Sequence, residues 1–71
     1  MLFWHLNKYI GKHLALFLNN GNIVTGVLEN ASEELIKINE VSIILGVRTI
    51  TLKSFYLIPK VISNVSIGLK Q

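Results

Sequence analysis

The chain has 71 residues, of which 51% are hydrophobic and 15% are charged, and its formal net charge is +3. This length holds one small domain and excludes a cofactor domain beside a separate substrate domain. The composition also excludes an intrinsically disordered chain, because disorder requires low hydrophobicity and high charge. A core this small cannot enclose so many apolar side chains. We therefore expect the chain to self-associate and to bury the surplus in an interface.

Charge is unevenly distributed along the sequence. All four acidic residues are glutamates between positions 29 and 40, whereas every other charge is basic. A basic balance favours an anionic partner such as nucleic acid, although the same charge also keeps a small hydrophobic protein in solution. Cysteine is absent, which excludes disulfides and thiolate metal sites and leaves the cytoplasm as the default location.

The apolar start of the chain, residues 1–18, raises the question of a membrane or signal segment. Lys8 and Lys12 interrupt it, it lacks a basic leading region, and no run approaches the ~20 apolar residues of a membrane span. We interpret it as part of the folded domain and expect no integral membrane association. Peripheral binding of its helix to a membrane surface stays open as a third possibility.

A short helix is predicted at the N-terminus, followed by strands. Leu2, Leu6 and Ile10 recur at helical spacing and Gly11 is a natural helix end, so we assign residues 1–11 to a helical segment. From Lys12 onward the apolar pattern has a period of two, which is typical of strands. The expected strands are residues 12–18, 23–30, 35–45, 49–58 and 61–67.

Turn residues and one glycine indicate how these strands are arranged. Asn20-Gly21 between the first two strands favours a tight hairpin turn. Gly26 lies inside the second strand, where glycine usually marks a bulge or a sharp bend. We predict a mainly β fold in which residues 12–68 form a strongly bent, five-stranded antiparallel barrel of the SH3-like or OB-like kind. The leading helix favours the SH3-like barrel, and residues 69–71 form a tail.

The segment from Gly11 to Leu28 resembles the first signature of Sm-like proteins, with Asn20-Gly21, Gly26 and Leu28 at the signature positions. The end of the chain, Leu57 to Val65, resembles the closing strands of Hfq, the bacterial branch of this family. The resemblance implies a homomeric ring in which the fourth strand of one subunit pairs with the fifth strand of the next. Unpaired strand edges favour such pairing on physical grounds as well.

The strands at the expected seam carry two more expectations. Alternation in the fourth strand predicts that Tyr56 and Ile58 face inward, and that Phe55 and Leu57 face outward toward the seam between subunits. A proline in place of Ile62 should convert the ring to a monomer, because proline removes a backbone donor from the fifth strand.

The RNA-binding residues of the family are only partly matched. The resemblance implies a uridine pocket with an aspartate and an asparagine around the second turn and an Arg-Gly between the last strands. Ser32 and Ile36 stand at the first two positions, and no Arg-Gly is present near the end. In Hfq a base stacks on an aromatic residue that corresponds to Glu34, and a Tyr-Lys-His run corresponds to Ile58-Pro59-Lys60. A carboxylate is unfavourable where a base stacks beside phosphate, so Lys60 is the usable cation there.

Four basic residues are candidates for RNA contact. Lys60 follows Pro59, where it would meet a phosphate at the pore of a ring. Lys8 and Lys12 flank the helix end and would form a basic rim, and Arg48 lies in the loop before the fourth strand. Each of the four is also compatible with an ordinary solvated cation.

Nothing in the sequence indicates catalysis. There is no Cys nucleophile and no Gly-rich phosphate loop after a strand, and His5 and His13 alone do not suggest a metal site. We predict that the protein is not an enzyme, needs no cofactor, and binds single-stranded RNA as a cytoplasmic homo-oligomeric ring. The alternative is a structural or protein-interaction module on the same barrel without RNA binding, which the departures in the uridine pocket favour.

Overall fold

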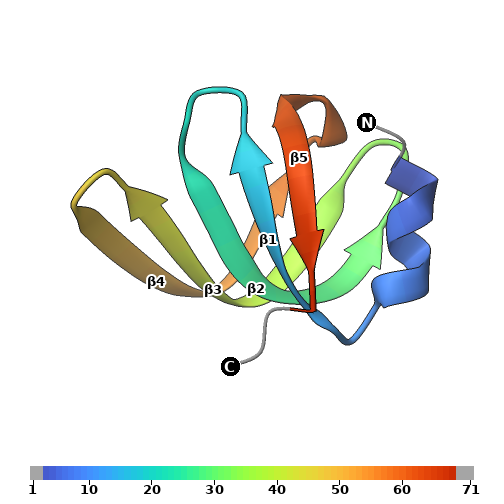
Figure 1. The fold of residues 1–71 in the computed structure, drawn as a ribbon. Helices are drawn as coiled ribbons and strands as arrows, with labels where there is room; N and C mark the ends of the chain where they lie inside the picture. The colour runs from blue at the N-terminus through green and yellow to red at the C-terminus, as the bar shows by residue number, and fades with distance from the viewer. Residues whose placement is uncertain (1–2, 69–71) are drawn as a thin grey trace.

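The computed structural model describes residues 3–68, whose course is shown in Figure 1. The predicted tail at 69–71 and the start of the predicted helix lie outside the described residues. All five predicted strands are present, and each begins and ends within one residue of the prediction. The elements are η1 (Phe3–Tyr9), β1 (His13–Leu18), β2 (Ile23–Ala31), β3 (Ile36–Leu45), β4 (Arg48–Leu57), η2 (Pro59–Val61) and β5 (Ile62–Ile67).

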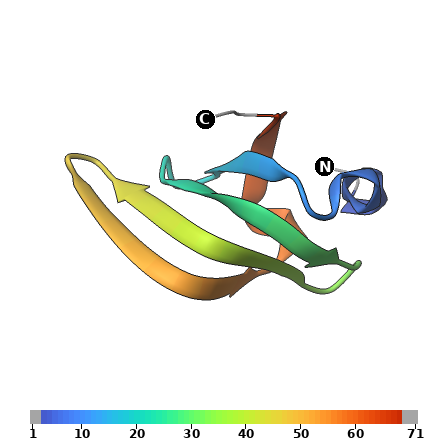
Figure 2. The ribbon, with the colours of Figure 1, turned by 90° about the horizontal axis from the view of Figure 1, so that it is seen from below.

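The strands form one open antiparallel sheet with the order β4-β3-β2-β1-β5. The first strand of the chain therefore lies inside the sheet, between β2 and the last strand, β5. Within residues 3–68, β4 and β5 are the two edges and are not paired with each other. Figure 2 shows that the sheet is curved and that η1 lies beside the end of β2.

The predicted N-terminal helix is present as a 3-10 helix rather than an α-helix. In a 3-10 helix residues three apart lie on the same side. Leu6, which is 2% exposed, and the half-buried Tyr9 are three apart, and both contact the hydrophobic core. Gly11 has a φ of 90°, a left-handed conformation that ends the helix as predicted. Its amide donates to the carbonyl oxygen of Leu28, 2.8 Å away, which ties the helix end to β2.

The core is aliphatic and lies on one side of the curved sheet. The first three strands, β1, β2 and β3, supply all of its fully buried side chains. Its fully buried side chains are Leu14, Leu16, Val24, Leu28, Ile36, Ile38 and Val41. Burying one such side chain contributes about 1.5–3 kcal/mol, so these seven are a main source of stability.

An irregularity at Gly26 interrupts the β2–β3 ladder, as the sequence predicts. The pairing register shifts between Thr25 and Val27. A Cβ atom on Gly26 would lie 2.5 Å from Cγ2 of Ile38 and 2.6 Å from the carbonyl oxygen of Asn39. Glycine is required here because β3 approaches too closely for any side chain.

Opposite this glycine, β3 contains one inserted residue. Ile38 and Val41 both face the core although they are three positions apart. Glu40 lies between them with a φ of 52°, in the left-handed region that non-glycine residues rarely adopt. The insertion is a bulge, which bends the strand and increases its local twist.

The predicted facing of the end of β4 is wrong. Leu57 is 7% exposed and Phe55 packs against the core, whereas Tyr56 and Ile58 expose 53% and 50% of their surface. Phe55 and Leu57 therefore belong to the interior, and Tyr56 belongs to the outer face of the sheet.

The bulge explains this error. Residues directly opposite each other in an antiparallel pair share one face, and Leu52 lies opposite the buried Val41. After Leu52, the next residue of β4 that faces the core is thus Phe55. The two are three positions apart, where regular alternation would give two, and the irregularity lies at the level of Glu40. An alternation extended through the whole strand places its second half on the wrong face.

Candidate nucleic-acid interface

Two connections meet at one end of the β3–β4 ladder. Ile36 at the start of β3 pairs with Leu57 at the end of β4. The β2–β3 turn (residues 32–35) and the β4–β5 connector (residues 58–61) therefore lie side by side. These are the two segments in which the sequence resemblance places the uridine pocket.

The β2–β3 turn does not supply the side chains of that pocket. The hydroxyl of Ser32 accepts hydrogen bonds from the backbone amides of Glu34 and Leu35, at 3.3 and 3.1 Å. The backbone amide of Ser32 donates to the carbonyl oxygen of Leu35. Ser32 thus shapes the turn. Ile36 is 0% exposed, so it cannot contact a base. Glu34 is exposed, so a carboxylate stands at the position for which the resemblance to Hfq implies a stacking aromatic side chain.

The β4–β5 connector is held against the β1–β2 turn. The side-chain amide of Asn19 donates to the carbonyl oxygen of Lys60 over 3.0 Å, and its backbone amide donates to the carbonyl oxygen of Val61 over 2.8 Å. These bonds fix the backbone of η2, while the side chain of Lys60 is exposed.

The backbone amide of Ile62 donates to the Pro59 carbonyl oxygen, and the side chain of Ile62 is buried. A proline at Ile62 would therefore damage the connector, and it is not a clean test of the ring.

The four candidate cations are all exposed but are not brought into one site. Lys8 and Lys12 lie near the start of β1, whereas Lys60 lies near its other end, where Leu18 pairs with Ile62. Arg48 begins β4 at the tip of the β3–β4 hairpin, at the opposite end of that strand from the connector. The structure separates them into a helix-end pair, the connector lysine and the hairpin arginine.

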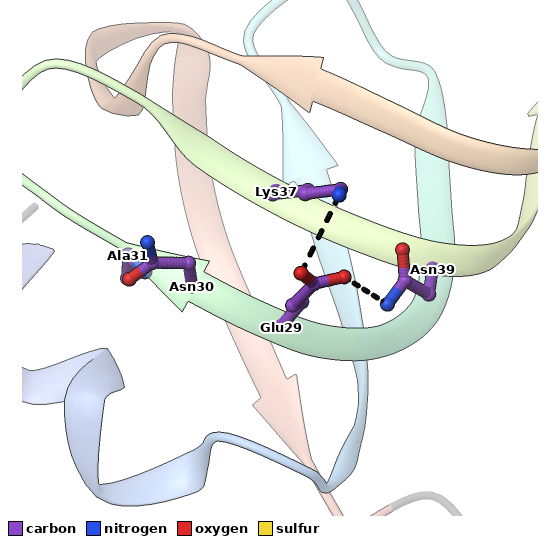
Figure 3. Close-up of polar contacts among 5 residues, drawn as sticks. All are labelled: Glu29, Asn30, Ala31, Lys37 and Asn39. Atoms are coloured by element: carbon purple, nitrogen blue, oxygen red, sulfur yellow. Dashed lines mark hydrogen bonds and ion pairs between the residues drawn. The ribbon is translucent and has the colours of Figure 1, made fainter.

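A polar cluster that was not predicted from the sequence lies on the outer face of β2, β3 and β4. Figure 3 shows its members on β2 and β3, and Tyr56 of β4 lies opposite Lys37. Glu29 lies between two residues of β3: its Oε2 is 3.4 Å from Lys37 Nζ, and its Oε1 accepts a hydrogen bond from the Asn39 amide. Lys37 Nζ also lies 5.5 Å from the centroid of the Tyr56 ring. Lys37 and Asn39 alternate with buried isoleucines, a pattern that could have placed them outward. Tyr56 was missed because the bulge shifts the alternation of β4, so that this side chain faces outward and not inward.

Electrostatic contacts within this cluster favour the charged forms. The hydrogen bond from Asn39, opposed by slight desolvation and assisted by Lys37, lowers the pKa of the Glu29 carboxyl. Contacts with Tyr56 and then Glu29 raise the pKa of the Lys37 ammonium. The two charges balance each other, so the cluster is close to neutral as a whole.

Two hollows lie near the turn end of the sheet. One of about 380 Å³ adjoins the cluster and is lined by Glu29, Asn30, Ser32, Leu35, Lys37 and Tyr56. The other, of about 270 Å³, is mainly apolar and is lined by Leu18, Asn19, Asn20, Phe55, Leu57 and Val61.

Within the described part of the chain, no group of three or more His, Cys, Asp or Glu side chains is arranged to hold a metal ion. None of the described helices is long and apolar enough to cross a membrane.

The fold matches solved structures of Sm proteins. A heptameric archaeal Sm protein is 14% identical, with a TM-score of 0.78 over 90% of this chain and 96% of the other. The SmAP1 heptamer of P. aerophilum is 15% identical, with a TM-score of 0.80 over 93% and 90%. A chain in the crystal structure of the NatC complex bound to CoA is 17% identical, with a TM-score of 0.77 over 87% and 82%. No protein-family model and no curated protein matches the sequence.

These similarities establish an Sm-like fold, as the sequence resemblance predicted. The fold has five antiparallel strands in an open sheet, and the predicted N-terminal helix is a short 3-10 turn. At this level of identity they establish the fold alone.

Proposed function

We propose that the chain assembles head to tail into a ring and that this ring binds single-stranded RNA. The observation that carries the proposal is the pair of unpartnered edges: within the described residues, β4 and β5 each pair with one neighbour only. Ile50 and Leu52 lie on the core side of β4, opposite Ile43 and Val41, yet expose 42% and 40% of their surface. A strand from a second copy along β4 would pair the edge and cover both side chains. The heptamers formed by the two similar Sm proteins support this arrangement.

Barrel closure is part of the same proposal. The connector between Leu57 and Ile62 holds four residues, which allow a span of at most about 18 Å. The two edges of a flat five-stranded sheet lie about 19 Å apart. Three of the four connector residues are also wound into η2, which shortens the connector further and favours a sheet curled strongly enough to bring β4 toward β5. This supports the strongly bent barrel.

Lys60 is the residue we assign to phosphate contact at the ring pore. It is exposed, and its backbone is fixed by Asn19, so every subunit would present the same cation in the same place. Weak contacts repeated around a ring add by multivalency. We assign Lys8 and Lys12 to a secondary basic rim and Arg48 to the outer tip of the hairpin. The net charge of +3 supports an anionic partner. We place the ring in the cytoplasm. We also propose that it binds RNA and catalyses no reaction.

The ring is tested by the size of the assembly in solution. Leu52→Lys should reduce the particle from an oligomer to a monomer in light scattering, because a lysine on the covered face would bury a charge. Ile10→Lys is the matched control, since Ile10 is 48% exposed and lies at the helix end rather than on a sheet edge. A wild-type monomer, or an unchanged size for folded Leu52→Lys, contradicts the ring.

RNA binding is tested by fluorescence anisotropy with labelled oligonucleotides over a salt series. Affinity should fall with salt, and Lys60→Ala should reduce the logarithmic slope by about 0.7 for each subunit that contacts a phosphate. Lys53→Ala removes one positive charge elsewhere and controls for net charge. Folded protein that binds no oligonucleotide at low salt contradicts the RNA proposal.

The second candidate is a protein-interaction module on the same fold. The burial of Ile36 and the acidic turn at Glu34 favour it, because both oppose the uridine pocket. The similarity to a chain in the NatC complex supports it as well. Absence of RNA binding by a confirmed oligomer would favour this candidate.

A further inference from the structure

We propose that the cluster of Tyr56, Lys37, Glu29 and Asn39 is a base-binding subsite that prefers bases with an exocyclic amino group (adenine, cytosine and guanine) over uracil, which has none. The inference rests on the proposed RNA binding and names a place and a base preference that lie outside the pore. It begins with Tyr56, a large aromatic side chain that is 53% exposed on the outer face of an edge strand.

The shape of the site suits a flat ring. Tyr56 lines a hollow of about 380 Å³ together with Leu35, which is 44% exposed. Single-stranded RNA is recognised through unstacked bases that lie on aromatic or apolar side chains. Tyr56 offers the aromatic surface and Leu35 an apolar wall.

The acceptor for an amino group is the carboxylate of Glu29, which lines the same hollow as Tyr56. Asn39 and Lys37 each donate one hydrogen bond to Glu29, one to each carboxylate oxygen. Each carboxylate oxygen has two lone pairs, so both retain capacity to accept from a ligand. Carboxylates accept from the amino group of cytosine in protein–nucleic acid contacts, and the amino group of adenine is an equivalent donor. Uracil has no amino group.

The charge of the cluster is compatible with a phosphate backbone nearby. An isolated carboxylate would repel phosphate, but Lys37 lies 3.4 Å from Glu29 and balances it. The Lys37 side chain is 30% exposed, so its ammonium can also contact a phosphate that follows the bound base. This arrangement differs from the turn position of Glu34, which forms no ion pair with any of the residues that the structure describes.

The test uses anisotropy with A, C and U oligonucleotides of equal length and wild-type protein. We expect A and C to bind about ten-fold more tightly than U, the equivalent of one good base contact. Tyr56→Ala should weaken binding of all three oligomers about five-fold or more, because stacking is tolerant of sequence, and Tyr56→Phe should retain it. Since Tyr56 is exposed, circular dichroism should show both variants folded.

Glu29→Ala and Glu34→Ala separate base recognition from charge. Both remove one negative charge, and both should bind U no more weakly than the wild type does. Only Glu29→Ala should bring A and C down to the level of U. Equal wild-type affinity for the three oligomers, a preference that persists in Glu29→Ala, or unchanged binding by Tyr56→Ala overturns the inference while Lys60-dependent binding survives. Absence of any binding by the wild type overturns the proposed function itself.

Discussion

Replacing Gly26 with alanine is the sharpest test of the bend in the sheet. The new Cβ would lie 2.5 Å from Ile38 Cγ2 and 2.6 Å from the Asn39 carbonyl oxygen. Overpacking a core typically costs about 1–3 kcal/mol, and the upper end applies because the backbone oxygen cannot rotate away. Alanine also recovers about 0.4–1 kcal/mol by restricting the unfolded chain. We therefore expect a net loss of about 2 kcal/mol, and a larger loss for Gly26→Val.

Thermal and urea unfolding followed by circular dichroism measure this loss. For a domain of this size, each kcal/mol lowers Tm by about 4–8 °C, so Gly26→Ala should melt about 8–16 °C below the wild type. Gly46→Ala is the control: Gly46 has a φ of 66°, but an added Cβ would have nothing within 4 Å of it. The backbone cost of about 1–2 kcal/mol applies, less the same recovery of about 0.4–1 kcal/mol from the unfolded chain, so the net loss should be about 1 kcal/mol and smaller than that of Gly26→Ala. The order of the two losses matters. If Gly26→Ala is as stable as the wild type, or more stable than Gly46→Ala, then β3 does not approach β2 as closely as described.

Three further changes test the turns and the polar cluster. Ser32→Ala should cost about 0.5–1.5 kcal/mol of unfolding free energy, because the amides of Glu34 and Leu35 lose their acceptor, and a loss equal to that of exposed Ser54→Ala would contradict this role. Asn19→Ala should cost a similar amount by releasing the Lys60 carbonyl; with Lys60 less fixed, RNA binding should weaken as well, and unchanged affinity would show that the anchoring is irrelevant to binding. Glu29 has a lowered pKa in the folded state, so its contacts stabilise the fold above its unfolded pKa of about 4.3 and are lost as pH falls through the lower folded value. The difference in unfolding free energy between wild type and Glu29→Gln should therefore shrink in acid, and a difference that is constant with pH would refute the assignment.

The sequence was sufficient for the strands because their local signals agree. Asn20-Gly21 marks a turn, Gly26 marks a close approach, and polar residues alternate with apolar ones in the first half of β3. The type of N-terminal helix was not predictable, since Leu6 and Tyr9 are also compatible with an α-helix. The predicted facing of residues 55–58 is wrong because one inserted residue, Glu40, changes the alternation of inward and outward side chains in both β3 and β4. Glutamate carries no local signal for a left-handed conformation.

The candidate site was less accessible to sequence reasoning than the fold. Exposed lysines could be named, but their separation by the length of β1 or β4 depends on which strands are neighbours. The cluster around Glu29 joins residues from three strands, and only the pairing register brings Lys37 opposite Tyr56. The neutralisation of Glu29 could not be inferred from the run of glutamates between positions 29 and 40, which indicates an acidic region.

The position of β1 inside the sheet has a consequence for how the chain folds. β1 and β2 form a local hairpin, but the other side of β1 pairs with β5, at the opposite end of the chain. Contacts between distant segments form slowly because a long loop must close first. Until β5 arrives, β1 is an edge strand, and the β5 of another copy has the same sequence and would fit equally well. Exchange of β5 between copies is thus the misfolding route that this topology leaves open at high concentration.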